Sequence, residues 1–122
     1  MKTISTDLAP KAVGPYSQGI MVDGFLFISG QIAINPETGL IEGNIEVQAK
    51  QAFENVGKIL EAAGMSFKNV VKTTLFLKNI SEFSYVNEIY SKYFISNPAR
   101  SCVEVSYIPK NSLIEIEVIA KK

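Results

Sequence analysis

The sequence predicts an α+β fold in which two helices pack on one face of a single β-sheet. The first reason is the order of its segments, which reads strand, strand, strand, helix, strand, helix, strand, strand. The second is that two segments show the apolar spacing of amphipathic helices, whereas the others are β-prone. The third is size, because 122 residues of which 47% are hydrophobic suit one domain, 1–122, with a core of its own.

The strands before the first helix include a β-hairpin. Gln18–Val22 and Phe25–Ser29 are apolar and β-prone, and Asp23-Gly24 between them favours the two-residue turn that matches the twist of the strands. Gly30 then interrupts the pattern. It indicates either a simple β-bulge or a place where a ligand or another chain approaches the backbone closely. The segment 35–39 has the composition of a surface turn.

Two amphipathic helices are predicted. Asn44 caps the first, which ends at Gly64. Asn79 and Glu82, three residues apart, resemble a capping box for the second, and Pro98 prevents that helix from continuing. The apolar face of the first helix consists of Ala49, Ala52, Phe53, Val56, Ile59, Leu60 and Ala63, and that of the second of Phe83, Val86, Ile89, Tyr90, Tyr93 and Phe94.

Three further strands complete the sheet. Val70–Lys78 is rich in β-branched residues, and its alternation places Val71 on the same side as Thr73, Leu75 and Leu77. The last two strands are Arg100–Tyr107 and Leu113–Ala120, and the short loop 108–112 between them favours an antiparallel pair.

The helices leave the other sheet face uncovered, and we expect polar side chains to gather on it. A period of two puts Arg100 and Cys102 on one face of their strand, and Glu115 with Glu117 on the face away from the helices. If Cys102 lies opposite Glu115, or the register slips by two residues, Arg100 and Glu115 project into the same space, whereas a slip of one residue separates them. The alternative to a functional pair is a plain Arg–Glu salt bridge. We expect this face to be buried in a ring of identical subunits.

Arg100 is the only arginine and Cys102 the only cysteine, and the chain has no histidine. A planar donor that is always charged is suited to holding a carboxylate. The usual zinc, haem and Ser-His-Asp sites need histidine, so any chemistry must use Arg, Glu, Tyr, Ser, Cys and backbone groups. Cys102 alone is typical of a small buried hydrophobic residue rather than of a nucleophile, because no histidine can activate it.

Charge and hydropathy limit the partners. The formal net charge is zero and the lysines are scattered, so nucleic acid is an unlikely partner. No apolar segment reaches the roughly 20 residues that span a bilayer, and Met1–Thr6 contains no signal-peptide core. We therefore expect no membrane association and a cytoplasmic location, with an organelle matrix as the alternative.

The motifs taken together resemble the YjgF/RidA family, whose members are also labelled endoribonuclease L-PSP. Singly they are weak: Gly14–Gln18 by itself indicates a turn, and Asn87 a local hydrogen bond. In this order they are specific, and they span nearly the whole chain. They are Gly14-Pro15-Tyr16-Ser17-Gln18, Phe27–Ile32, Asn55, Val86–Tyr90, Pro98–Val105, Ile108-Pro109 and Ile114–Glu117.

The resemblance implies a chorismate-mutase-like fold, a homotrimer with ligand clefts between subunits, and no cofactor. It implies hydrolysis of 2-aminoacrylate or 2-iminobutyrate to a 2-keto acid and ammonia. In that reaction Arg100 would hold the substrate carboxylate and Glu115 would activate the attacking water. Burial favours the protonated form of Glu115 and a nearby Arg100 opposes it, so the direction of its pKa shift stays open. Tyr16, Ser29 and backbone groups at Gly30 and Cys102 would bind the substrate.

One segment departs from the family pattern, and two other functions remain. Between Phe94 and Pro98 the chain has three residues, whereas family members commonly have a longer connection with an aromatic residue before the proline. We therefore expect this departure to affect the substrate range more than the reaction. The alternative functions are a single-strand endoribonuclease or translation inhibitor, and a non-catalytic module that binds a small carboxylate.

Overall fold

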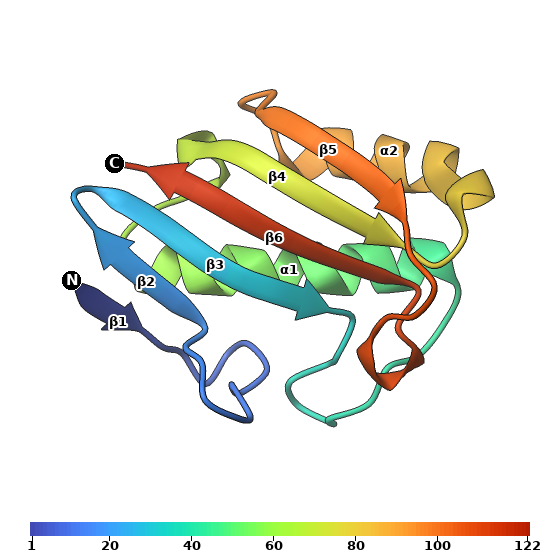
Figure 1. The fold of residues 1–122 in the computed structure, drawn as a ribbon, viewed down its shortest axis with the longest axis horizontal. Helices are drawn as coiled ribbons and strands as arrows, with labels where there is room; N and C mark the ends of the chain where they lie inside the picture. Colours follow the sequence, from blue (N-terminus) through green and yellow to red (C-terminus); the bar gives the residue numbers. More distant parts are fainter.

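The computed structural model describes all 122 residues as six strands, two α-helices and three short 3₁₀ turns (Figure 1). The strands form one mixed sheet in the order β1-β2-β3-β6-β4-β5. All neighbouring strands are antiparallel except β4 and β5, which are parallel. The elements are β1 Lys2–Ile4, β2 Gly19–Val22, β3 Phe25–Ile32, α1 Ile45–Ala62, η1 Phe67–Asn69, β4 Val70–Leu77, η2 Ile80–Glu82, α2 Phe83–Tyr93, β5 Ala99–Glu104, η3 Pro109–Asn111 and β6 Ile114–Lys121.

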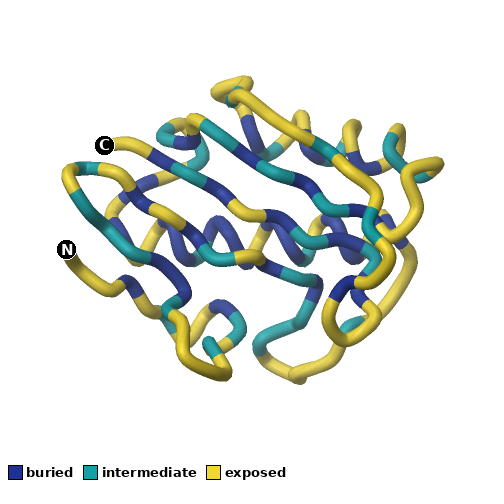
Figure 2. Tube along the Cα trace, viewed as in Figure 1, coloured by how far each residue is buried: buried dark blue, intermediate teal, exposed yellow.

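Both helices lie on the same face of the sheet, behind the strands in Figure 1, so the predicted fold class is confirmed. The core between the layers contains the apolar face of α1 and alternate residues of the central strands. Figure 2 shows this alternation as buried and less buried positions that follow one another along β3, β4 and β6. No helix is both long and apolar enough to cross a membrane.

The hairpin and the bulge are where the sequence predicts them. Val22 pairs with Phe25, and both turn residues, Asp23 and Gly24, have positive φ, as the predicted turn requires. In β3 the pairing with β6 shifts between Ile28 and Gln31, which places Gly30 in a β-bulge. Beyond the bulge, Gln31 and Ile32 pair with Ile116 and Glu115 at the start of β6.

The start of α2 differs from the prediction. For α1, the Asn44 side chain accepts a hydrogen bond from the Val47 N–H, and Gly64 follows the helix at φ 71°, as expected. For α2, Asn79 caps the 3₁₀ turn η2 by accepting from the Ser81 N–H, and Glu82 returns no side-chain bond. The predicted capping box is therefore wrong. Asn79 caps the 3₁₀ turn η2, which lies between it and the start of α2.

The predicted face of Val71 is also wrong. A register shift between Val70 and Lys72 leaves Val71 44% exposed, whereas Thr73, Leu75 and Leu77 point into the core. The bulge changes the alternation by one residue at the start of β4, so that Val70 rather than Val71 joins the core.

The predicted pairing of the last two strands is wrong. β6 lies between β3 and β4, and β5 lies at the sheet edge beside β4. The connection in the structure, residues 105–113, passes only the end of β4. There the Leu77 carbonyl accepts a hydrogen bond from the Val105 N–H, and the Lys78 N–H donates to the Leu113 carbonyl. The buried aliphatic residues of β6 favour the centre of the sheet, whereas β5, which ends at Glu104 rather than Tyr107, has no fully buried residue.

The inserted strand reverses the predicted face of Arg100. Arg100 pairs with Thr73, whose hydroxyl hydrogen-bonds the Tyr90 hydroxyl of α2, so both side chains are on the helix face. Glu115 pairs with Phe76 on the opposite face. Cys102, aligned with Leu75, also faces the helices. The expected sharing of one face by Arg100 and Glu115 is therefore wrong within one chain.

The face away from the helices stays uncovered, as expected. Apolar side chains from several strands are partly exposed on it, including Phe27 at 45% and Val103 at 45%. Glu115 and Glu117 lie on the same face. This open face is defined here by the outward residues of β3, β4, β5 and β6.

Candidate functional site

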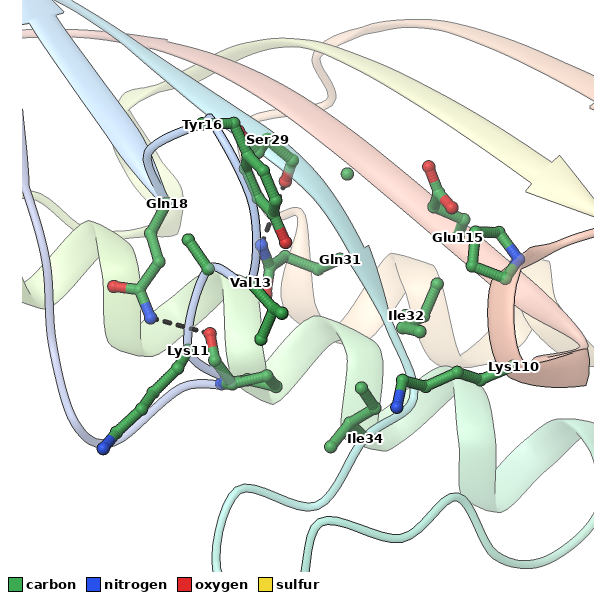
Figure 3. Close-up of a pocket in the computed structure, with 14 residues that line it drawn as sticks. Lys11, Val13, Tyr16, Gln18, Ser29, Gln31, Ile32, Ile34, Lys110 and Glu115 are labelled. Carbon is green, nitrogen blue, oxygen red and sulfur yellow. Dashed lines mark hydrogen bonds between the residues drawn. The ribbon is translucent and has the colours of Figure 1, made fainter.

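A pocket of about 560 Å³ lies beside the open face and contains four of the six predicted site residues. Its walls are the loop before β2, the second half of β3 and the start of β6 with the turn η3 (Figure 3). Tyr16, Ser29, Gly30 and Glu115 line it, together with Pro10, Lys11, Ala12, Val13, Gln18, Gln31, Ile32, Ile34, Pro109 and Lys110.

The bulge at Gly30 makes room for the Glu115 carboxyl group. A side chain at position 30 would place its Cβ 2.9 Å from Glu115 Cδ and 3.2 Å from Cγ, which is closer than van der Waals contact. The bulge predicted at Gly30 is confirmed, whereas nothing tests the predicted approach of a ligand or another chain. The group that approaches is a side chain of the same chain, from the strand that pairs with β3.

Glu115 is the one carboxyl group in the pocket, and burial raises its pKa above the usual value of 4.5. The neighbouring negative charge of Glu117 raises the pKa further. Within one chain Arg100 does not oppose the shift, because it lies on the other sheet face. A carboxyl group whose pKa is moved toward neutrality is able both to accept and to return a proton.

The polar side chains around Tyr16 are used largely to hold the loop before β2. The Ser29 hydroxyl donates to the Ser17 carbonyl at 2.6 Å, so it ties this loop to β3. The Gln18 side chain, only 4% exposed, bonds several backbone groups of the same loop. Tyr16 itself is 53% exposed, and in Figure 3 its ring stands over the pocket.

Arg100 lies in a different setting, at the edge of the sheet beneath α2. Its Nη1 donates to the Asn87 Oδ1 at 2.8 Å, and its guanidinium lies 4.7 Å from the Tyr90 ring centre and 5.2 Å from that of Phe83. The guanidinium lines a separate hollow of about 410 Å³ between α2 and the start of β5. One amide bond leaves most of its N–H donors available to a ligand.

Cys102 is half-buried on the same face as Arg100. Burial raises the pKa of its thiol, and the positive charge of Arg100 offsets this only in part. A thiol with a raised pKa is a poor nucleophile at neutral pH. Cys102 therefore fits a contact or wall residue, and not a covalent catalyst.

The six predicted residues thus fall into two groups on opposite faces. Tyr16, Ser29, Gly30 and Glu115 share the pocket, whereas Arg100 and Cys102 lie at the β5 edge. Sequence reasoning missed the contribution of Gln18, Lys11 and Lys110 to the pocket, because loops bring them there. No group of three or more acidic or cysteine side chains is placed to hold a metal ion.

Fold and pocket together define a small single-sheet α+β protein with an acid-bearing, small-molecule-sized pocket beside an open sheet face. The family model described as Endoribonuclease L-PSP matches residues 6–122. The chain belongs to this family, which is also known as YjgF/RidA.

The chain is similar to a named enzyme and to solved structures of the same fold. The human 2-iminobutanoate/2-iminopropanoate deaminase is 53% identical over 98% of this chain and 88% of its own. The Escherichia coli YjgF gene product has the same fold, with a TM-score of 0.94 and 43% identity over 100% of this chain and 99% of that one. E. coli TdcF, solved with bound serine, has a TM-score of 0.96 and 40% identity over 100% of this chain and 99% of its own.

Proposed function

We propose that this protein hydrolyses reactive 2-imino acids and their enamine tautomers, such as 2-iminobutyrate and 2-aminoacrylate. Water adds to the C=N carbon, the C–N bond breaks, and a 2-keto acid and ammonia leave. The observation that carries the proposal is 53% identity, over nearly the full chain, to a human enzyme named for this reaction. Serine bound to TdcF supports a ligand of amino-acid size and charge.

Glu115 is the proposed proton-transfer group. In its ionised form the carboxylate accepts a proton from the attacking water, and the resulting acid returns that proton to the departing nitrogen. Its burial and its raised pKa are suited to both steps. The bulge at Gly30 leaves the carboxyl group open to the pocket, where a substrate carbon could lie beside it.

Arg100 is the proposed carboxylate anchor, supplied by a second copy of the chain. Within one chain it is on the other sheet face from Glu115, so one chain does not bring the two together. Asn87 and the rings of Phe83 and Tyr90 fix the guanidinium, which reduces the entropy lost when it binds a carboxylate. Arg100 lies at the exposed edge strand, where a neighbouring subunit can be reached.

The proposed assembly is a homotrimer with three such clefts. The family resemblance implies three subunits, and the exposed apolar side chains of the open face favour a partner. A closed ring repeats one interface three times, so each Glu115 pocket meets one neighbouring β5 edge. Cys102, Tyr16 and Ser29 then contact the ligand or support the wall of the cleft.

The test couples the protein to a threonine dehydratase, which releases 2-iminobutyrate, and follows 2-oxobutyrate formation. We expect the protein to accelerate keto-acid release well above spontaneous hydrolysis. Absence of acceleration would remove the deaminase assignment. RNA cleavage that survives repurification and depends on Glu115 would favour the endoribonuclease alternative, and binding without turnover the non-catalytic one.

The matched variants are Arg100→Lys and Arg100→Ala. Lysine keeps the charge and loses the planar two-point geometry, so we expect an intermediate loss. Alanine should lower kcat/KM by about 100-fold because the substrate carboxylate loses its orienting partner. Undiminished activity in Arg100→Ala would show that the carboxylate is held elsewhere.

A further inference from the structure

The loop before β2 has hydrogen bonds at its two ends and almost none between them. From Pro10 to Ser17 the only hydrogen bond within the segment runs from the Tyr16 N–H to the Gly14 carbonyl. Val13 in its middle is 85% exposed. Nevertheless this segment supplies one wall of the pocket, including Pro10, Lys11, Val13 and Tyr16. Its position must therefore come from the bonds at its ends.

At the Pro10 end the bonds converge on one buried side chain, that of Gln18. Its Oε1 accepts from the Thr6 N–H at 2.7 Å, and its Nε2 donates to the Thr6 carbonyl at 3.1 Å and to the Pro10 carbonyl at 2.8 Å. A fourth, longer contact joins Nε2 to the Ala9 carbonyl at 3.4 Å. At the other end, the Ser29 hydroxyl holds the Ser17 carbonyl.

The chemistry of these bonds calls for an amide at position 18. The loop presents one N–H and three carbonyl groups, so the side chain must both accept and donate. A carboxylate would face the three carbonyl oxygens without a proton to give, and an apolar side chain of the same length would leave partly buried backbone groups unpaired. Ala9, 1% exposed in the core, fixes the loop next to this network.

We propose that Gln18 is a positioning residue for the pocket: its amide holds Thr6–Pro10 in place and so keeps the wall formed by Pro10–Tyr16 closed over the substrate. Gln18 acts through this wall rather than on the reacting atoms. The inference deepens the proposed function and rests on it for its kinetic consequences. Its structural consequence, a fixed loop, does not depend on turnover.

The test compares Gln18→Met with Gln48→Met. Gln48 is a matched control because it is also buried, at 6% exposure, and its amide bonds the Gly43 carbonyl and the Leu113 N–H without lining the pocket. Both variants should unfold at lower temperature. Only Gln18→Met should raise KM, by about tenfold with kcat within about twofold, because a loose wall weakens ground-state and transition-state binding alike.

Two further readouts separate this inference from the deaminase assignment. Amide hydrogen exchange should quicken at Thr6 in Gln18→Met and stay unchanged there in Gln48→Met. Titration with 2-oxobutyrate, the keto-acid product, should show weaker binding only in Gln18→Met. Equal KM and equal binding in both variants would overturn the inference. If the unaltered protein neither turns over the imine nor binds 2-oxobutyrate, the proposed function fails, and unchanged exchange at Thr6 would then also refute the role of Gln18.

The conservative variant Gln18→Glu adds a condition-dependent test. When the introduced carboxyl group is protonated, it can donate one bond to a loop carbonyl, and when ionised it repels all three. We expect the ratio of its KM to that of the unaltered protein to fall as the pH is lowered toward the range where a buried carboxyl group protonates. A defect in Gln18→Glu that is the same at every pH would contradict the assigned hydrogen-bond pattern.

Discussion

At the scale of single residues, Glu115 and Arg100 lie on opposite faces of one sheet, and the surroundings on each face determine how each side chain behaves. Glu115 lies in a pocket where burial and Glu117 raise its pKa, and Arg100 is fixed by Asn87 and two aromatic rings. Neither environment depends on the other within a chain. The proposed chemistry, however, requires both groups at one substrate.

The raised pKa of Glu115 predicts the acidic limb of the pH profile. The carboxylate must be ionised to accept a proton from water, so kcat/KM falls as the pH drops through the pKa of Glu115 in the free enzyme. Within one chain burial and Glu117 raise that pKa above the usual 4.5. The Arg100 charge that a neighbouring subunit brings to the proposed cleft acts in the opposite direction, so the midpoint should lie higher in Arg100→Ala than in the unaltered protein. The measurement is kcat/KM for 2-iminobutyrate against pH, with the imine supplied chemically so that no coupling enzyme limits the range.

Glu115→Gln is the direct companion to that profile. The amide keeps the shape and loses the proton acceptor, so kcat should fall by about 10²- to 10⁴-fold while the fold is retained. A Glu115→Gln enzyme with full activity and the same acidic limb would show that another group performs proton transfer. Circular dichroism of the variant provides the control for folding.

Cys102 should be dispensable for bond making. Its thiol pKa is raised by burial, so little thiolate exists at neutral pH. We expect Cys102→Ala to keep kcat within about tenfold, because its proposed contribution is a backbone and wall contact. Complete loss of turnover in this variant, with an intact fold, would revive covalent catalysis.

At the scale of elements, the β3 bulge is the feature that makes room for the carboxyl group of Glu115, the proposed proton-transfer group. A methyl group at position 30 would collide with the Glu115 carboxyl group, which would have to move away. Gly30→Ala should therefore abolish most activity with little loss of stability, because the end of a flexible side chain can shift. Gly39→Ala is the control: it has a positive φ of 76° and no atom within 4 Å of the added methyl group. It should cost about 1 kcal/mol through backbone strain and leave turnover intact.

Local chemistry predicted most elements but not their neighbours in the sheet. Asp23-Gly24, Asn44 and Gly64 determine turns and caps within a few residues, so the hairpin and α1 were predictable. The place of β6 depends on contacts far apart in sequence. A short loop indicated adjacency to β5, although the stronger signal was the aliphatic alternation of β6, which suits a central strand.

The wrong pairing of β6 with β5 also limited how much of the site could be predicted. Alternation correctly grouped Arg100 with Cys102, and Glu115 with Glu117. It could not relate the two groups, because that requires knowing which strand lies between them. The Gln18 network was equally hidden, since it joins the start of a strand to a loop without a periodic pattern.

At the scale of the whole molecule, the open face predicts association. Exposed apolar residues such as Phe27 and Val103 are expected to become buried between subunits. Light scattering should give about 40 kDa, three times the 13.4 kDa of the chain. Phe27→Glu should shift the protein toward monomers and reduce turnover with them. A fully active monomer would contradict shared clefts.

The central claim, that Glu115 of one chain works with Arg100 of its neighbour, is tested most directly by mixed trimers. Arg100→Ala and Glu115→Gln chains, each with its own affinity tag, are co-expressed and purified through both tags. Each homotrimer should keep about 1% of the activity or less, whereas every mixed trimer holds one site with both groups intact. We predict about one third of the activity of the unaltered trimer. Mixed trimers as inactive as either parent would contradict a shared site.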